Sequence, residues 1–203
     1  TLTENFMVAA SYLQTDGEPQ TLIYYTYDGI TWHGSQSNLF NITSSCIIRQ
    51  IEWNGTIWLA VGQNNGDPFV LYSTDGIYWH ASNTANALLS SCVPKSVKWS
   101  KNIWIIGTDS ATTPIIYSYD GFNWDVSTTA AAIFAAGVSQ IGTNGNLSIA
   151  YGGSVFGYSN DGITWLTASD PFSGEPIINI SWISYINMRR MIKIYTIQRL
   201  LYK

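Results

Sequence analysis

The sequence predicts an all-β fold built from repeated four-stranded units, and three observations support this. The chain has 203 residues, of which 14% are aromatic and only 11% charged, about half the usual charged fraction. Tyr, Thr, Ser, Asn and Gly are abundant, and this mixture favours strands and turns. One eight-residue pattern occurs four times, and the segments between its copies consist of short strand-like runs separated by turn signals.

The repeated pattern is Y-[ST]-x-D-G-x-x-W, and its aspartates lie 47, 45 and 41 residues apart. An Asp followed by Gly can satisfy the amides of a turn, Gly supplies a positive φ, and a Trp at fixed register fills the same gap in each unit. We therefore expect the Asp, Gly and Trp of every copy to be structural. These residues are Asp28, Gly29, Trp32, Asp75, Gly76, Trp79, Asp120, Gly121, Trp124, Asp161, Gly162 and Trp165.

The second unit, residues 46–82, illustrates the strands within one repeat. Asn54-Gly55 is a hairpin signal, Asp75-Gly76 marks a second turn, and Gln63–Pro68 is expected to form a polar loop between them. The strands expected around these turns are Ile47–Trp53, Thr56–Val61, Phe69–Ser73 and Ile77–Ala81. Four short antiparallel strands in each unit of about 45 residues predict a β-propeller blade. Almost no helix is expected before residue 187.

The repeats predict a single propeller domain over residues 1–186, followed by a basic extension over 187–203. The units cover about 5–35, 46–82, 92–127 and 136–168. The first lacks an innermost strand, and 177–186 resembles the innermost strands of the second and third units. We therefore expect this segment to pair with Phe6–Ala10 and close a ring of four blades. A fragment of a larger ring, or two chains sharing one ring, are the alternatives.

The four copies resemble the Asp-box, or BNR, repeat of sialidase-like β-propellers, whose usual form is S-x-D-x-G-x-x-W. Here one residue is missing between Asp and Trp, as in Ser73–Trp79. This compact form is similar to repeats in uncharacterised propeller proteins of large DNA viruses and phage tails. The resemblance implies a structural box on the turn between the third and fourth strands, with the Trp packed between blades. It also implies that the chain is a viral protein.

The distribution of charge limits the partners of the propeller. Residues 1–186 hold all thirteen acidic residues and only four basic ones, a formal charge of −9, whereas 187–203 carry +5. Because phosphate binding needs clustered Lys and Arg, we expect no nucleic acid on the acidic body. No apolar run reaches 18 residues, so no membrane span is predicted. No signal peptide is visible.

Catalytic and cofactor motifs are not found in the sequence. Arg49 is the only arginine before residue 189, so the arginine cluster that a sialidase uses for its substrate carboxylate cannot be assembled in the body. The sequence predicts a non-enzymatic module; the alternative is a carbohydrate-active hydrolase of a reduced sialidase-like type, using Glu52 and Glu175. We expect no cofactor and no metal, since His33 and His80 have no third ligand at fixed spacing.

The two cysteines, Cys46 and Cys92, occupy matching positions in neighbouring units. Equivalent points on adjacent blades are normally too far apart for a disulfide. Free thiols are therefore expected, and they favour the cytoplasm or a virus particle.

Binding is expected on one face, on the polar loops that join the second and third strands of each unit and on the loops between units, because both sets of loops vary while the strands repeat. Their side chains suit a glycan or a protein partner. The candidate ligand-binding residues are Asp16, Asn64, Asp67 and Asp109. The chain is expected to be a monomer or a ring-sharing oligomer.

Overall fold

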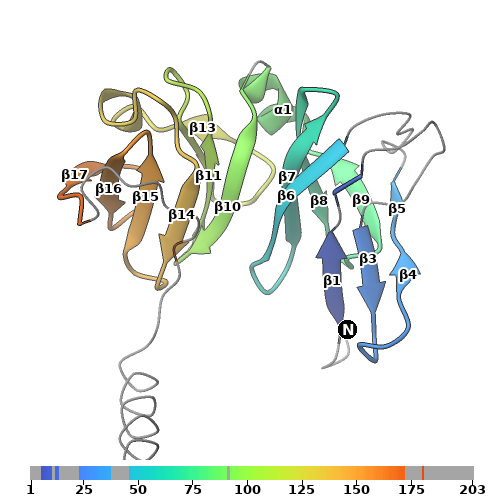
Figure 1. Ribbon diagram of the computed structural model, residues 1–203. Coiled ribbons are helices and arrows are strands. Elements are labelled where there is room, and N and C mark those ends of the chain that lie inside the picture. Colours follow the sequence, from blue (N-terminus) through green and yellow to red (C-terminus); the bar gives the residue numbers. More distant parts are fainter. Residues whose placement is uncertain are drawn as a thin grey trace, which may run out of the picture.

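The computed structural model describes residues 6–10, 12–13, 23–37, 46–90, 92–171 and 180. Strands dominate these residues and form four sheets, which lie side by side in chain order (Figure 1). We call the sheets the first to fourth blades. The all-β propeller predicted from the repeats is confirmed.

The first two blades are linked by short strands. The first blade has the order β1-β3-β4, and the second is a sheet of order β6-β7-β8-β9 with β2 and β5 added at its two edges. Antiparallel β2 pairs with β6, whereas β5 runs parallel to β9. The bounds are β1 Met7–Ala10, β2 Tyr12–Leu13, β3 Ile23–Thr26, β4 His33–Gly34, β5 Gln36–Ser37, β6 Cys46–Trp53, β7 Trp58–Asn64, β8 Asp67–Ser73 and β9 Tyr78–Ala81.

The third and fourth blades are simple four-stranded meanders, β10-β11-β12-β13 and β14-β15-β16-β17. All their strand pairs are antiparallel, as short hairpin connections require. The bounds are β10 Pro94–Ser100, β11 Ile103–Thr108, β12 Ile115–Ser118, β13 Asp125–Val126, β14 Gln140–Thr143, β15 Ser148–Gly152, β16 Val155–Ser159 and β17 Leu166–Ala168.

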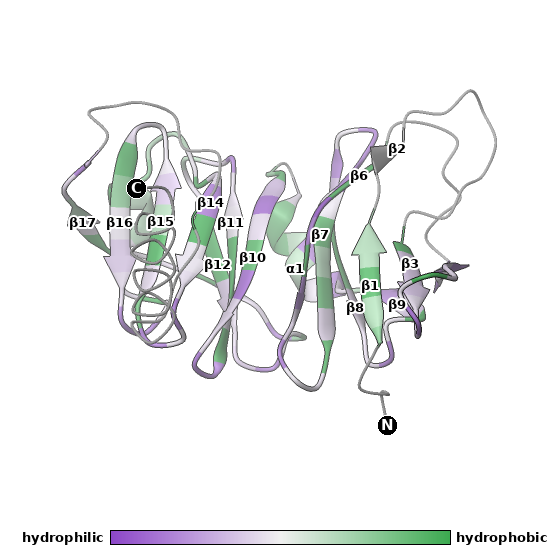
Figure 2. Cartoon of the chain, turned by 60° about the horizontal axis from the view of Figure 1, so that its bottom comes forward, coloured by the Kyte–Doolittle hydropathy of each residue, from purple (hydrophilic) through white to green (hydrophobic). Residues whose placement is uncertain are grey.

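Apolar side chains on facing sheets form three cores, one at each junction between blades. Figure 2 shows hydrophobic residues along the strands and hydrophilic ones at many of the turns. The middle core, between the second and third blades, contains Leu59, Val97 and Trp104. Those on either side of it contain Ile23 with Trp79 and Ile105 with Trp165. Each sheet between two others is therefore covered on both faces, as expected for stacked blades.

Polar contacts join the innermost strands of neighbouring blades. Lys98 Nζ on β10 lies 3.0 Å from Glu52 Oε2 on β6, and Gln50 accepts a hydrogen bond from the Val97 amide. Ser100 and Thr143 share a hydroxyl hydrogen bond of 2.8 Å between β10 and β14. Strand β10 therefore lies between β6 and β14, which fixes the order of the blades.

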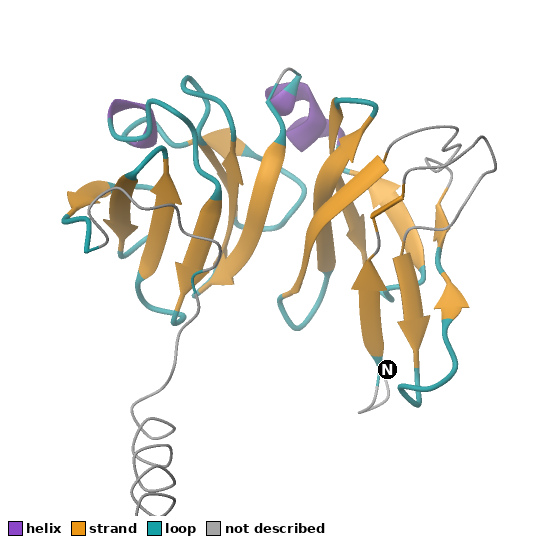
Figure 3. Cartoon of the chain, in the orientation of Figure 1, coloured by secondary structure: helices purple, strands orange, loops and turns teal. Residues whose placement is uncertain are grey.

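The described residues contain two short helices, α1 (Asn83–Leu89) and the 3₁₀ helix η1 (Ala130–Ala132), both in connections between blades. They agree with the prediction of almost no helix, whereas one local expectation was wrong. The expected loop Gln63–Pro68 is a tight hairpin turn, because Asn65 and Gly66 have φ of 51° and 91° and so extend β7 and β8 to its ends. Figure 3 shows both helices on the same side of the blades, which we call the connection face. The opposite side is the box face.

Ring closure falls largely outside the described residues. Of the segment 177–186, only Ile180 is described, and its side chain lies next to Gly142 of β14. Among the described residues, β1 pairs with β3 alone, and the first and fourth blades lie at opposite ends of the row (Figure 1). Pairing of 177–186 with Phe6–Ala10 stays a prediction.

Candidate functional site

Each Asp-Gly box is held by the same set of hydrogen bonds. In the second box, Ser73 Oγ donates to Asp75 Oδ1 at 3.0 Å and accepts the Gly76 amide at 2.8 Å. Asp75 Oδ1 also accepts the amides of Ile77 and Tyr78 at 2.8 and 2.9 Å. The boxes around Asp28, Asp120 and Asp161 repeat this pattern. The first box uses Thr26 in place of Ser.

These hydrogen bonds favour ionised carboxylates. Burial raises the pKa of Asp120, but the amides of Asn123 and Phe122 and the Asn123 side chain outweigh it, so the pKa falls to about 2. Hydrogen bonds from the amides of Thr31 and Ile30 lower the pKa of Asp28 to about 2. The box carboxylates therefore act as fixed acceptors that satisfy turn amides.

Three of the four box tryptophans seal a junction between blades. Trp79, Trp124 and Trp165 are buried, and each donates its Nε1–H to the carbonyl of its own box Gly at 3.1–3.2 Å. Trp32 differs from these three, because 41% of it is exposed. Each buried Trp lies in the core shared with the preceding blade. No blade precedes the first among the described residues.

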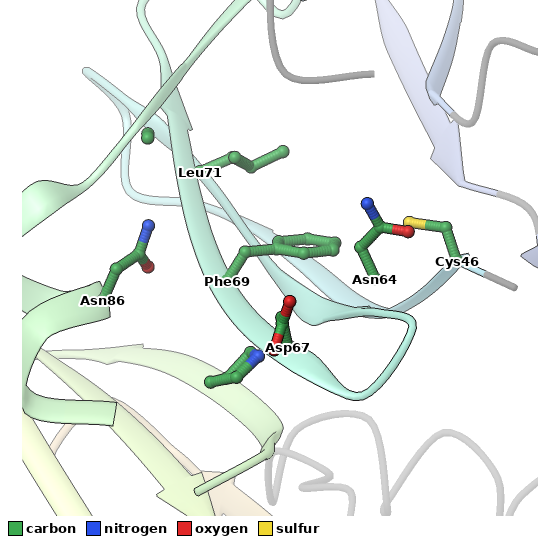
Figure 4. Close-up of a pocket in the computed structure, with 8 residues that line it drawn as sticks. Cys46, Asn64, Asp67, Phe69, Leu71 and Asn86 are labelled. Atoms are coloured by element: carbon green, nitrogen blue, oxygen red, sulfur yellow. The ribbon is translucent and has the colours of Figure 1, made fainter. Parts of the chain in front are cut away.

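A pocket of about 160 Å³ opens at the connection-face end of the second blade. Its walls are mainly apolar. Polar side chains come from the last residue of β7, the first residue of β8 and helix α1. Figure 4 shows Phe69 in the middle of the site, with Asn64 beside Cys46 and Asn86 coming from the helix. The lining residues are Cys46, Asn64, Asp67, Pro68, Phe69, Leu71, Ala81 and Asn86.

The polar groups of the pocket differ in how they are engaged. Asn64 Oδ1 is buried and has no hydrogen-bond partner among the described residues. Asn86 Oδ1 accepts the Val70 amide at 2.7 Å, which ties α1 to β8. Burial raises the pKa of the Cys46 thiol to about 11. A thiol that stays protonated is a poor nucleophile.

The candidate ligand-binding residues from the sequence are only partly brought together. Asn64 and Asp67 face each other across the β7–β8 hairpin and line the pocket. Asp109 does not line it; its carboxylate forms an ion pair with Lys95 at 2.8 Å and accepts the Val93 amide at 2.8 Å. Its backbone and side chain thus fasten the start of the third blade. Asp16 lies outside the described residues.

The residues considered for catalysis or metal binding are not gathered into one site. Glu52 is paired with Lys98, and Glu175 lies outside the described residues. His33 and His80 are exposed and lie against Tyr25 and Tyr72. In the described part of the chain, no three His, Cys, Asp or Glu side chains cluster as a metal site would require.

Sequence reasoning placed the connection over residues 82–91 on the binding face, but it missed the apolar walls of the pocket, helix α1 and Asn86. Phe69 and Leu71 were expected only as strand residues, and Asn86 lay in a connection without a motif. The available signal was the alternation of side chains along β8. Phe69 and Leu71 share the face opposite Val70, so both faces of this strand end are apolar and either could line a cavity.

No described helix is long and apolar enough to span a membrane. Comparison with known protein families and with curated proteins finds no match. Among solved structures, a chain described as "YCF48 bound to D1 peptide" matches with a TM-score of 0.56 and 18% sequence identity. The match covers 89% of this chain and 61% of that one, so this chain spans less than two thirds of its length. YCF48 is a β-propeller, and at this identity the likeness shows the fold alone.

Proposed function

We propose that the chain is a non-enzymatic binding module that holds a peptide segment of a protein partner on its connection face. The observation that carries the proposal is the pocket of the second blade, where an amide oxygen without a partner among the described residues lies at an apolar cavity. Binding sites commonly combine apolar walls with a few polar groups that fix orientation.

The volume of the pocket limits its occupant. A cavity of about 160 Å³ is smaller than most sites for whole small molecules, which start near 300 Å³. It is close to the size of an engineered cavity that holds one benzene, about 150 Å³. One aromatic or branched aliphatic side chain of a peptide therefore fits, with Phe69 and Leu71 as its apolar contacts.

The acceptor groups beside the apolar walls favour a ligand that carries hydrogen-bond donors. Asn64 Oδ1 and the Asp67 carboxylate accept hydrogen bonds, so a peptide N–H next to the inserted side chain would satisfy them. A buried acceptor left without a donor costs roughly 1–3 kcal/mol, and a bound donor removes this cost. The D1 peptide bound to YCF48 is consistent with this ligand class, although it says nothing of this pocket.

The test is selection of displayed random peptides on the wild-type chain, followed by affinity measurements on variants. Ala81→Phe should fill the pocket and abolish binding, and Asn64→Ala should weaken it by roughly tenfold, the effect of losing about 1.4 kcal/mol. Asp125→Asn removes an exposed carboxylate from β13, outside the pocket, and serves as the control. Peptides that bind Ala81→Phe as well as wild type would contradict the proposal.

A second candidate ligand is a glycan on the box face. A groove there is lined by Tyr27 from the first blade and Trp53, Thr74 and Asp75 from the second. Trp53 is fixed by a tilted contact with Trp58, with ring centroids 4.9 Å apart. Aromatic faces beside hydroxyl and carboxylate groups suit a sugar ring. A glycan array tests this, with Tyr27→Ala expected to remove any selective signal.

The hydrolase alternative is separated by a screen of chromogenic glycosides. A binding module should give no turnover. Turnover that Glu52→Gln or Glu175→Gln abolishes would instead favour the reduced sialidase-like enzyme.

A further inference from the structure

The three junctions between blades share one contact, made by the box Gly of the later blade. A Cβ built on Gly76 would come within 2.7 Å of Phe6, and one on Gly162 within 2.8 Å of Ile105. At the middle junction, a Cβ on Gly121 would come within 2.5 Å of Ile57. Each box therefore rests directly on the preceding blade.

The first blade carries an intact box that rests on no other blade among the described residues. A Cβ built on Gly29 would meet no atom within 4 Å, and Ile30 is 84% exposed. Its backbone and hydrogen bonds match those of the other boxes. We define the leading face as Gly29, Ile30 and Trp32. It presents the same box residues that pack against the preceding blade at the three internal junctions, but here no described blade covers them.

The fourth blade carries the matching cover. Leu59 and Ile105 lie opposite the box Tyr of their own blades, and both are fully buried by the blade that follows. Ile149 lies opposite Tyr158 in the same register, yet it is only half-buried, as is Leu147. We call Leu147 and Ile149 the trailing face.

The two faces cannot meet within the chain as described, because the first and fourth blades lie at opposite ends of the row (Figure 1). Ile180 lies against Gly142 of β14, on the innermost strand of the fourth blade. At an internal junction, the innermost strands β6 and β10 are joined by the ion pair between Glu52 and Lys98.

We infer that two copies of this chain join head to tail, with the leading face of each packed on the trailing face of the other. The interface would reproduce a junction that the chain already builds three times. A head-to-tail contact closes into a ring when its rotation allows. Two chains of four sheets each give a ring at the upper end of the roughly four to eight blades that propellers use.

Light scattering on the full chain, over a wide range of concentration, tests the inference. Wild type should show twice the mass of one chain. Ile30→Lys alters the leading face and should give the mass of a single chain, and Leu147→Glu on the trailing face should do the same. Both main chains stay hydrogen-bonded as before, because the bonds of Ile30 and Leu147 in the box and turn are made by backbone groups.

Mixing the two variants distinguishes this interface from a symmetric one. The intact trailing face of Ile30→Lys can bind the intact leading face of Leu147→Glu, so the mixture should regain the doubled mass. The matched control is Tyr119→Lys, since Tyr119 is an exposed aromatic in the box of an internal blade; its mass should equal that of wild type. Circular dichroism confirms that each variant is folded.

Two results would overturn the inference. One is a wild-type chain with the mass of a single copy at every concentration, which would indicate closure within one chain or an uncovered face. The other is a doubled mass that Ile30→Lys and Leu147→Glu leave unchanged, which would place the contact elsewhere.

Discussion

At the scale of single residues, the box Asp links the fold to pH. The pKa of Asp120 falls from its usual 3.8 to about 2 in the folded chain. Folding therefore favours the ionised form, and this stabilisation is complete above the unfolded pKa and lost as the pH falls through the folded one. The window is roughly pH 5 to pH 2.

We expect Asp120→Asn to lower the denaturant midpoint at neutral pH, with a difference from wild type that shrinks as the pH approaches about 2. Unfolding in denaturant across this pH range measures it. Asp125→Asn removes an exposed carboxylate outside the box and should keep the pH dependence of wild type. A constant difference for Asp120→Asn would show that its charge does not contribute.

The box glycines separate backbone strain from packing. Gly29 and Gly121 both have a positive φ, 73° and 82°, so Ala is strained at each by about 1–2 kcal/mol. Only Gly121 would also place a Cβ against the side chains of Ile57 and Trp104. We expect Gly121→Ala to destabilise the chain by roughly 1–3 kcal/mol more than Gly29→Ala, the usual cost of overpacking. Equal losses would contradict the contact between blades.

At the scale of elements, the second, third and fourth blades each depend on the Trp that they present to the blade before them. Trp79→Ala should cost roughly 3–5 kcal/mol, as for other buried aromatics. Trp32→Ala should cost about 1 kcal/mol, the central value for substitutions, in samples dilute enough to be monomeric. Denaturant midpoints measure the loss of stability in the two Trp variants.

The control for Trp79→Ala is His80→Ala. His80 is next to Trp79 in sequence but exposed, so this substitution should change stability by about 0.5 kcal/mol or less. A large loss of stability in His80→Ala would contradict the assignment of Trp79 to the buried face of the strand and His80 to the exposed face.

The elements that sequence predicted well are those with a local signal. The four boxes and the longer strands of the second and third blades follow from turn residues and β-rich runs, which act within a few positions. Strands β2 and β5 have two residues each, too few to show a period. Helix α1 has seven residues, and a helix this short is stabilised by packing on β8 more than by its own sequence.

The candidate site could be predicted only in part, for a related reason. Asn64 and Asp67 are polar residues of one expected loop, Gln63–Pro68, so the sequence suggested both. Cys46 joins them through the register of β6 with β7, and Asn86 through its bond to the Val70 amide. These contacts depend on how strands and helix pack. Asp109 lies outside this pocket, and its carboxylate forms an ion pair with Lys95 that its position in the sequence did not indicate.

At the scale of the whole molecule, the three cores make each blade depend on its neighbours. Leu59 belongs to the core between the second and third blades, and Phe134 to that between the third and fourth. A repeat whose stability lies mainly in its interfaces unfolds together with the repeats that it contacts. The described blades should therefore behave as one cooperative unit.

We expect Leu59→Ala and Phe134→Ala each to reduce the free energy of unfolding by roughly 2–5 kcal/mol. Each variant should still unfold in a single transition, with a lower midpoint than wild type. Circular dichroism and tryptophan fluorescence should report coincident transitions for both variants, because a loss at one junction removes the support for the next. Hydrogen exchange adds a local readout: in Phe134→Ala, amides of β7 should lose protection together with those of β15. If the second blade kept its full protection while the fourth exchanged freely, each junction would hold only its own pair of sheets, and the coupling along the row would be wrong.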